Sequence, residues 1–294
     1  MKIRIPATSA NLGPGFDSLG LAISLYNYVN IIPYTCQSIS IKGEGSNRSR
    51  LKVNNVFVSI FKEIYKELDA QKKSFRFEFE NSIPFSRGLG SSSAVIVGAI
   101  ASAYYMAGIK VTKETVLNRA LVYENHPDNI APAVYGGFTT SIVVDGTVKT
   151  LKKELPKTLK AVIVIPDRAM STAHSRTQLA KTFVMKDVVF NSSRVGFMSA
   201  AFMSENWDML KYASYDKIHE NRRMKKLREL FGVRKIALKN GALMSTLSGS
   251  GSSFFNLVYE KDAQNLKNSL KNSFPNFKIE VFDFDNIGFE ITNT

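Results

Sequence analysis

A glycine- and serine-rich stretch at residues 84–94 (PFSRGLGSSSA) has the residue types that bind a phosphate group. Its glycines permit a tight turn and close backbone approach, because no Cβ blocks either. The apolar run at residues 95–104 predicts a buried helix, so the stretch leads into a helix N-terminus, where unpaired N–H groups attract an anion. It lacks both the lysine of a Walker loop and the three-glycine spacing of a dinucleotide site. Taken alone, it is either a polyphosphate site or a helix N-cap with a glycine turn.

A second cluster, residues 124–129 (ENHPDN), places two carboxylates, an imidazole and two amides beside a proline. Glu124 has the chemistry to bind Mg²⁺, which prefers one or two carboxylates together with phosphate oxygens. Asp128 has the chemistry to receive or orient a hydroxyl proton. An isolated histidine such as His126 is more often structural, but its polar neighbours favour a functional site.

The remaining polar candidates are spread along the rest of the chain. Residues 6–20 (PATSANLGPGFDSLG) hold Asn11 and Asp17, which can bind the hydroxyl, carboxylate or ammonium of a ligand, or simply stabilise a turn. Arg176 and Arg223 are each either a bidentate ligand for a carboxylate or a surface residue. A further glycine/serine loop at residues 247–253 allows backbone or ligand to approach closely.

Mixed strand and helix patterns must position these loops. Alternating phenylalanines predict a half-buried strand at residues 75–79 that leads into the glycine stretch. Further strands are predicted at 138–144, 161–165, 254–259 and 277–284. Helices are predicted at 55–68, 112–123 (with Thr112 as the cap), 187–214, in the basic span that follows residue 214, and at 262–272. Because strands and helices do not alternate regularly, the prediction is an α+β fold. The composition changes at residues 146–160, which are rich in lysine and contain a proline, and this change predicts a boundary between domains 1–155 and 156–294.

Composition narrows the class of protein. The single cysteine, Cys36, excludes an internal disulfide and a cysteine-rich metal site, so a cytoplasmic location is expected. Neither a signal peptide nor a membrane span is predicted. The formal charge of +14 suggests either a nucleic-acid surface or a solvated basic face, and the densest basic span, residues 217–239, lacks the aromatic residues that stack on bases. The solvated face is therefore favoured.

Taken together, the three glycine/serine loops in this order resemble the three motifs of the GHMP family of small-molecule kinases. Within that family, residues 6–20 and residues 126–137 (HPDN, APA and GG) resemble the members that act on homoserine in threonine biosynthesis. The resemblance covers residues 3–258. It implies a two-domain α+β fold, with an S5-like N-terminal domain, a ferredoxin-like C-terminal domain, and ATP and substrate in the cleft between them.

The resemblance also implies an activity, transfer of the γ-phosphoryl group of ATP to the hydroxyl of L-homoserine, with Mg²⁺ as cofactor. The implied nucleotide-binding residues are Pro84, Arg87, Gly88, Leu89, Gly90, Ser91, Ser92 and Ser93. The implied Mg²⁺ ligands are Ser92 and Glu124, with Glu114 as the alternative glutamate. Asp128 and Asn129 are the implied catalytic residues at the hydroxyl. The implied substrate-binding residues are Asn11, Asp17 (at the ammonium), His126, Thr172, and Arg176 and Arg223 (at the carboxylate).

Two stretches depart from the family pattern. Residues 251–253 read Gly-Ser-Ser where a Gly-Pro pair is usual, and residues 219–223 read HENRR instead of His-Gln-Pro-Tyr-Arg. The second departure makes Arg222 an alternative to Arg223, although the spacing favours Arg223.

Rival functions remain within and outside the family. A kinase acting on mevalonate, shikimate or a sugar would leave Asp17 without an ammonium partner. An RNA-binding protein of S5-like fold would leave Glu124 and Asp128 unexplained, because acidic groups repel phosphate unless a metal intervenes. The predicted partner is therefore a small-molecule substrate, with neither nucleic acid nor membrane, and a homodimer is left open.

Overall fold

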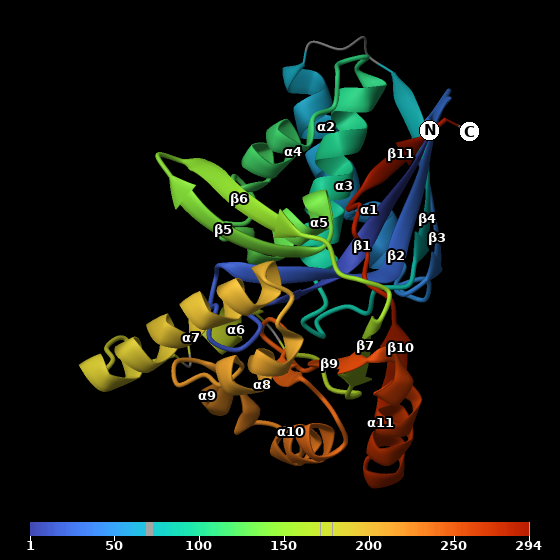
Figure 1. The fold of residues 1–294 in the computed structure, drawn as a ribbon. Coiled ribbons are helices and arrows are strands. Elements are labelled where there is room, and N and C mark those ends of the chain that lie inside the picture. Colours follow the sequence, from blue (N-terminus) through green and yellow to red (C-terminus); the bar gives the residue numbers. More distant parts are fainter. Residues whose placement is uncertain (69–72, 171, 178, 294) are drawn as a thin grey trace.

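The computed structural model describes residues 1–68, 73–170, 172–177 and 179–293, and only the backbone of residues 172–174. Its strands form two sheets (Figure 1). The first sheet has the order β11-β1-β2-β4-β3, with β5 pairing with β2 and β6; all pairs are antiparallel except β3 with β4. Its strands are β1 (Lys2–Ala10), β2 (Leu19–Tyr34), β3 (Ser38–Gly43), β4 (Ser74–Asn81), β5 (Phe138–Val144), β6 (Thr147–Lys153) and β11 (Glu290–Thr292).

Helices cover one face of the first sheet. They are α2 (Val56–Glu67), α3 (Ser91–Met106), α4 (Lys113–Ala120) and α5 (Pro127–Tyr135), and a short α1 (Arg50–Val53) precedes them (Figure 1). The predicted alternation in β4 is confirmed, because Phe75 and Phe77 are buried and their rings pack edge-on against Phe61 of α2. The middle of α3 is buried, and Gly98 allows this helix to approach Ile5 of β1 closely.

The second sheet is antiparallel, with the order β10-β7-β9-β8. Its strands are β7 (Leu159–Ile165), β8 (Met244–Leu247), β9 (Phe254–Tyr259) and β10 (Lys278–Phe282). A separate apolar core joins this sheet to α10 (Glu229–Lys239) and α11 (Glu260–Ser273). The remaining helices are α6 (Thr172–Thr177), α7 (Met185–Met203), α8 (Leu210–Ala213) and α9 (Glu220–Met224), with a 3₁₀ turn at Trp207–Met209.

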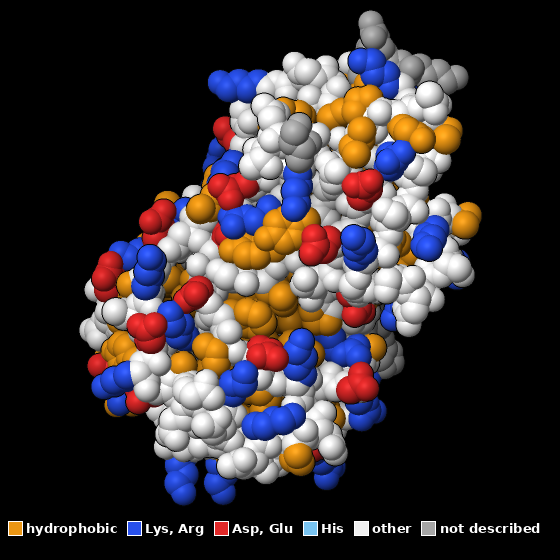
Figure 2. All heavy atoms as spheres, turned by 90° about the vertical axis from the view of Figure 1, so that its right-hand side faces the viewer, with side chains coloured by type: hydrophobic (Ala, Val, Ile, Leu, Met, Phe, Trp, Pro, Cys, Tyr) orange, Lys and Arg blue, Asp and Glu red, His pale blue; other side chains and the backbone are white. Residues whose placement is uncertain are grey.

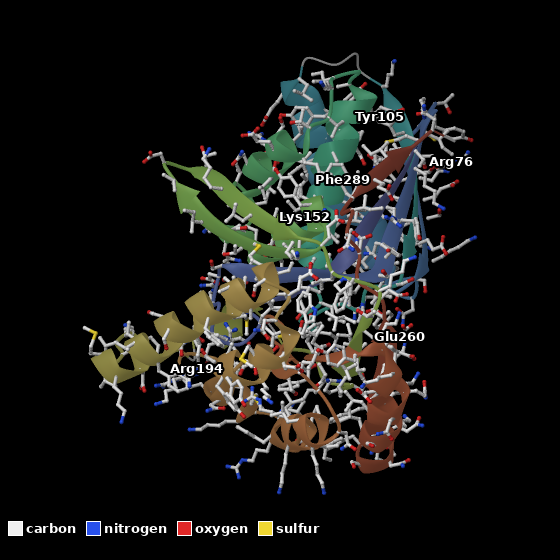
Figure 3. The ribbon with its side chains drawn as sticks, in the orientation of Figure 1. Arg76, Tyr105, Lys152, Arg194, Glu260 and Phe289 are labelled. Atoms are coloured by element: carbon white, nitrogen blue, oxygen red, sulfur yellow. The ribbon has the colours of Figure 1, made fainter. Side chains whose placement is uncertain are left out.

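The two chain ends meet on the first sheet. Strand β11 pairs with β1 in the register Lys2 to Thr292, so the last residues return from the second sheet to the first (Figure 1). Phe289, labelled in Figure 3, is buried, and its N–H donates to the carbonyl of Ala133 in α5. The change of sheet falls between Lys153 and Leu159, beside the boundary predicted at residue 155. The bounds 1–155 and 156–294 remain a prediction, and β11, which lies in the second of these ranges, pairs with the first sheet.

Most predicted elements are confirmed, and two are wrong. Strands 138–144 and 254–259 have the predicted bounds, and Thr112 caps α4 by accepting the N–H of Thr115. The single helical pattern predicted at 187–214 is divided, because α7 ends at Met203 and Glu205 adopts a left-handed backbone conformation (φ +59°). The basic span likewise forms two helices, α9 and α10.

On the face drawn in Figure 2, lysine and arginine side chains are spread out and do not form one patch. Acidic and basic side chains alternate over most of that face, and several basic side chains project at its lower end. Within the part of the chain that the structure describes, no helix is both long and apolar enough to cross a bilayer.

Candidate active site

A cavity of about 590 Å³ is lined by loops from both sheets. The β1–β2, β4–α3 and α4–α5 loops contribute from the first sheet, and residues after β7, in α9 and between β8 and β9 contribute from the second. The cavity brings together every predicted site residue except Thr172, whose side chain lies outside the described residues. The alternatives Glu114 and Arg222 are exposed and are not among its lining residues.

The glycine stretch forms the N-terminus of α3. Gly90 is the N-cap, at φ +67°, and no side chain caps the helix among the described residues. Gly88, at φ +75°, lies against the 247–253 loop, where a Cβ would come within 2.9 Å of the Gly251 nitrogen. Because glycine alone combines these backbone angles with such close packing, the sequence forces an open helix N-terminus to face the cavity. This geometry suits an anion.

Arg87 fixes the glycine stretch to the second sheet. Its Nε donates to the carbonyl of Pro166 at 3.0 Å, and its Nη2 donates to Asp167 Oδ1 at 3.1 Å. The backbone N–H of Ser253 donates in turn to the Arg87 carbonyl at 2.9 Å. Arg87 therefore joins the two sheets at the edge of the cavity.

Glu124 and Ser93 form an oxygen-rich pair in the cavity wall. The Ser93 hydroxyl donates to Glu124 Oε2 at 2.7 Å, whereas Ser92, the predicted partner of Glu124, is exposed. Burial raises the pKa of the Glu124 carboxyl, against the hydrogen bond from Ser93, which lowers it. A half-buried carboxylate beside a hydroxyl is the kind of donor set that Mg²⁺ accepts when phosphate oxygens complete it.

His126 links the two carboxylates of the second cluster. Its Nδ1 lies 3.2 Å from Asp128 Oδ1 and 3.7 Å from Glu124 Oε1. Burial lowers the pKa of His126, but the hydrogen bond and charge of Asp128 outweigh burial, so the pKa is raised overall. Asp128 is itself buried, in the first turn of α5. The imidazole therefore orients a carboxylate that faces the cavity.

Thr8 is a contact that the sequence reasoning missed. Its hydroxyl donates to Asn129 Oδ1 at 2.7 Å, and its backbone N–H donates to the carbonyl of Leu89. Strand β1 thus holds both the catalytic candidate Asn129 and the glycine stretch. Nothing in the sequence separated Thr8 from the other small polar residues of its motif.

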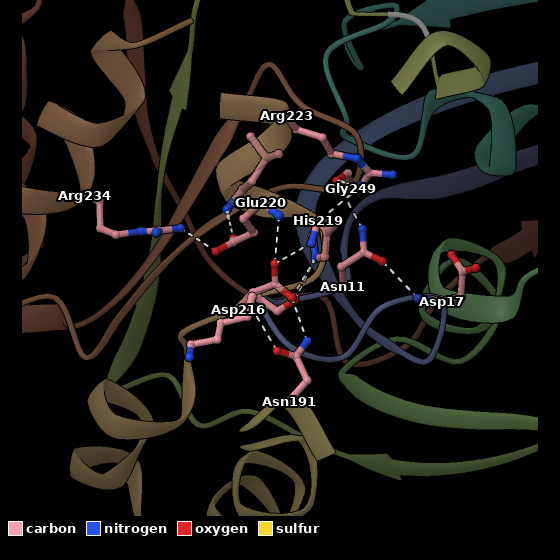
Figure 4. A network of polar contacts seen from close by, with 12 residues as sticks. Asn11, Asp17, Asn191, Asp216, His219, Glu220, Arg223, Arg234 and Gly249 are labelled. Carbon is pink, nitrogen blue, oxygen red and sulfur yellow. Dashed lines mark hydrogen bonds and ion pairs between the residues drawn. The ribbon is translucent and has the colours of Figure 1, made fainter. Parts of the chain in front are cut away.

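Two arginines and an aspartate define the other end of the polar site. Arg176 Nη2 lies 2.6 Å from Asp17 Oδ1. Arg223 Nη1 donates to the carbonyl of Gly249 at 3.0 Å (Figure 4). Asn11 donates to the same carbonyl and accepts the N–H of Asp17. Arg223 is only 3% exposed, and its Nε has no hydrogen-bond partner among the described residues. Burial, followed by the charge of Arg176, lowers the pKa of Arg223 to about 10.

Behind Arg223 lies a buried polar network that the sequence did not predict (Figure 4). Asp216 Oδ2 accepts the N–H groups of His219 and Glu220 at 2.7 and 2.8 Å, which caps α9. The fully buried Glu220 accepts the N–H of Leu247 at 2.6 Å and pairs with Arg234. Burial raises the pKa of Glu220 to about 7, although the charge of Arg234 opposes this. The network fixes α9, and with it Arg223, against the 247–253 loop.

The part of the cavity next to Phe85 has a more apolar lining than the polar site described above. The Arg48 guanidinium lies 5.2 Å from the centre of the Phe85 ring, and Leu51 and Val56 also line this part. An aromatic ring, a planar cation and apolar side chains together suit a flat heterocycle. Sequence reasoning missed this group, because only Phe85 belongs to a recognised motif, and Arg48, Leu51 and Val56 come from segments with none.

Comparisons with known proteins agree along the whole chain. The model of the GHMP kinases N terminal domain matches residues 55–137, and that of the GHMP kinases C terminal domain matches residues 198–276. A homoserine kinase of Aliarcobacter butzleri is 58% identical over 291 residues, 99% of each chain. One of Nitratiruptor sp. is 59% identical over 288 residues, 98% of each chain.

Solved structures give the same result for the fold. The crystal structure of homoserine kinase from Cytophaga hutchinsonii superposes with a TM-score of 0.87 at 27% identity, covering 99% of this chain and 96% of that one. Mevalonate kinase of L. major in complex with R-mevalonate superposes with a TM-score of 0.73 at 17% identity, covering 97% and 96%, and this likeness concerns the fold alone.

Proposed function

The chain belongs to the homoserine kinases of the GHMP kinase family, and on this premise we propose how its cavity binds ATP and L-homoserine and which residues transfer the γ-phosphoryl group. The observation that carries the proposal is the content of one cavity. It holds an open helix N-terminus for phosphates, a carboxylate for an ammonium, and two arginines for a carboxylate. Only a zwitterionic amino alcohol beside a nucleotide uses all three groups.

ATP lies along the glycine stretch in this proposal. The free N–H groups at the start of α3 hold the phosphates, and residues 88–93 follow them closely because Gly88 and Gly90 carry no side chain. Arg48 and Phe85 supply a platform for the adenine, since a ring face and a guanidinium both stack on a flat base.

Mg²⁺ is proposed to bind at Glu124. The donor set fits, because Glu124 and the Ser93 hydroxyl are oxygen ligands only 2.7 Å apart, and Ser92 lies on the same helical turn. When bound there, the ion neutralises charge on the phosphate oxygens. Replacing Glu124 with glutamine is expected to raise the Mg²⁺ concentration for half-maximal rate by roughly tenfold or more. Glu114→Gln, on the exposed face of α4, is the matched control and should leave that concentration unchanged.

Homoserine is proposed to lie between Asp17 and the arginine pair. Its ammonium approaches Asp17, its carboxylate replaces Asp17 as the ligand of Arg176, and the guanidinium of Arg223, which lines the cavity, binds the same carboxylate. Its hydroxyl then points to Asp128 and Asn129. Mevalonate, shikimate and sugars lack the ammonium, so they would leave Asp17, a half-buried carboxylate, without the cation that homoserine supplies.

Phosphoryl transfer needs positioning more than covalent help. The homoserine hydroxyl oxygen forms a bond to the γ-phosphorus, the bond from that phosphorus to the β–γ bridging oxygen breaks, and ADP leaves. We propose that the Asp128 carboxylate accepts the hydroxyl proton, with His126 holding the carboxylate in place at 3.2 Å. Asn129, held by Thr8, orients the hydroxyl from the other side.

A coupled ADP-release assay across homoserine, mevalonate, shikimate and galactose tests the proposal. Arg176→Ala should raise the KM for homoserine by a factor corresponding to about 2–5 kcal/mol, because a charge-assisted contact is lost, while the KM for ATP stays nearly constant. Arg222→Ala, one residue from Arg223 but exposed, is the control. Equal losses for both substrates would mean that Arg176 supports the fold and does not bind the carboxylate.

The RNA-binding alternative is weaker, since Asp17, Glu124 and Asp128 all line the cavity and repel phosphate. Filter binding measured against salt separates the two functions, because phosphate-driven binding falls steeply with ionic strength. The cytoplasmic location and the homodimer stay predictions. Light scattering of the purified chain measures the second.

A further inference from the structure

We propose that Phe16 is a positioning residue for substrate selection, whose ring packs against the guanidinium groups of both Arg176 and Arg223 and orients them toward the homoserine carboxylate. The inference rests on the proposed carboxylate site. It adds a residue that contacts neither the reacting atoms nor the phosphates, and that acts through the two arginines.

The position of the ring carries the inference. The Cζ atom of Arg176 lies 5.2 Å from the centre of the Phe16 ring, and the Cζ atom of Arg223 lies 5.3 Å from it. The two arginines come from different helices, α6 and α9, and their positive charges repel each other across the site. An aromatic face attracts both cations, so one ring offsets part of a repulsion that would otherwise drive the guanidiniums apart.

Backbone hydrogen bonds within the loop around Phe16 hold the ring in a fixed position. The N–H of Gly15 donates to the carbonyl of Asn11 at 3.0 Å, and the N–H of Ser18 donates to the carbonyl of Gly15 at 3.0 Å. The next residue after Phe16, Asp17, has a left-handed backbone (φ +59°) and pairs with Arg176. One short loop therefore supplies both the counter-charge and the ring for the same arginine.

His219 packs against the Phe16 ring and hydrogen-bonds to Arg223. The two ring centroids lie 5.1 Å apart, and His219 Nε2 lies 2.7 Å from the carbonyl of Gly13. A carbonyl can only accept, so Nε2 carries the proton and Nδ1 is left as the acceptor for Arg223 Nη1 at 3.2 Å. Burial lowers the pKa of His219 to about 4, in keeping with this neutral form.

Hydrogen bonds and the Phe16 ring hold the Arg223 guanidinium in one orientation. Nη1 is occupied by the carbonyl of Gly249 and by His219, and the ring of Phe16 packs against the guanidinium. The Nε is buried and has no partner among the described residues, whereas Arg223 as a whole lines the cavity, where its guanidinium meets the carboxylate in this proposal. Without the ring, both arginines gain rotamers that point away from this arrangement, and a carboxylate must reorder them on binding.

The test replaces Phe16 with leucine and measures steady-state constants for three acceptors. Homoserine and 4-hydroxybutyrate have the carboxylate, whereas 3-aminopropan-1-ol keeps the hydroxyl and ammonium without it. We expect Phe16→Leu to raise the KM for the two carboxylates by roughly tenfold, the size of two lost cation–ring contacts, with the ATP KM within about twofold. The specificity constant for 3-aminopropan-1-ol should not change. Phe16→Tyr, which keeps the ring, should restore the homoserine KM.

Phe190→Leu is the matched control. Phe190 is also half-buried, and its ring also lies against two cations, 3.3 Å from Arg194 Cζ and 4.5 Å from Lys217 Nζ, but neither cation lines the cavity. It should lose stability like Phe16→Leu without any change in KM. Phe16→Met serves as a second variant should the leucine protein fail to fold, with folding followed by circular dichroism.

Two results would overturn the inference: an equal loss with 3-aminopropan-1-ol, or a leucine variant that matches the wild type with homoserine. Arg223→Ala separates this outcome from failure of the carboxylate site itself. If Arg223→Ala raises the homoserine KM and Phe16→Leu does not, only the role of Phe16 is wrong. If neither variant changes it, the carboxylate site is wrong as well.

Discussion

Replacing Gly90 with alanine tests whether close packing of the glycine stretch on β1 builds the active site. Gly90 has φ +67°, and a Cβ placed on it would overlap the Thr8 hydroxyl and lie 3.2 Å from Asn129 Oδ1. Three costs follow: about 1–2 kcal/mol for alanine in a left-handed conformation, about 1–3 kcal/mol for overpacking, and about 1–3 kcal/mol if Thr8 can no longer bond Asn129. We therefore expect Gly90→Ala to lower the free energy of unfolding by about 3–8 kcal/mol.

Two further variants separate these costs. Gly108 has a similar backbone angle, φ +76°, but no atom lies within 4 Å of the position that a Cβ would occupy there, so Gly108→Ala measures the backbone cost alone. Thr8→Ala removes the hydroxyl that the new Cβ at Gly90 would meet. Each single variant loses the hydrogen bond from Thr8 to Asn129, but the double variant Thr8→Ala with Gly90→Ala loses that bond only once. The double variant should therefore be about 1–2 kcal/mol more stable than the sum of the two single losses predicts.

Urea unfolding at constant m-value gives the stabilities, and ADP release gives kcat for the variants that fold. Because Asn129 is held by Thr8, Gly90→Ala should lower kcat together with stability, whereas Gly108→Ala should change stability only. The reasoning is refuted if Gly90→Ala costs no more than Gly108→Ala. It is also refuted if the Thr8 and Gly90 substitutions add within about 0.5 kcal/mol.

Three other predictions concern charged groups. Asp128→Asn should lower kcat by roughly 100-fold or more at unchanged ATP KM, and full turnover in the ADP-release assay would refute a base role. The raised pKa of His126 means that its protonated form stabilises the fold at low pH and that this contribution is lost as pH rises through the folded-state pKa, so the destabilisation by His126→Asn in urea unfolding should be larger at about pH 6 than at about pH 9. Glu220→Gln leaves Arg234, whose side chain is only 14% exposed, without its counter-charge and should destabilise by about 3–5 kcal/mol. The double change Glu220→Gln with Arg234→Met, in which the glutamine oxygen still accepts the N–H of Leu247, should restore most of that loss; a double variant no more stable than the single would contradict this account of the pair.

Local patterns predicted much of the fold because they depend on neighbours along the chain. The alternation of Phe75 and Phe77 placed β4, and the capping hydroxyl of Thr112 placed the start of α4. The same reasoning failed at Glu205, since a charged residue in a left-handed conformation has no signature in the sequence. The return of β11 to the first sheet also had none, because its partner is at the other end of the chain.

For the site, the sequence by itself determined which chemistry the chain carries: glycines that open a helix N-terminus, carboxylates beside a histidine, and arginines in polar stretches. Only the tertiary structure decided which members of each group meet. Consecutive residues on a helix point about 100° apart, so the packing of α3 selects Ser93 over Ser92 for Glu124, and the packing of α9 buries Arg223 and exposes Arg222. Thr8 and Phe16 gained their partners in the same way. A residue's type follows from the sequence, but its direction depends on contacts between segments that are far apart in the chain.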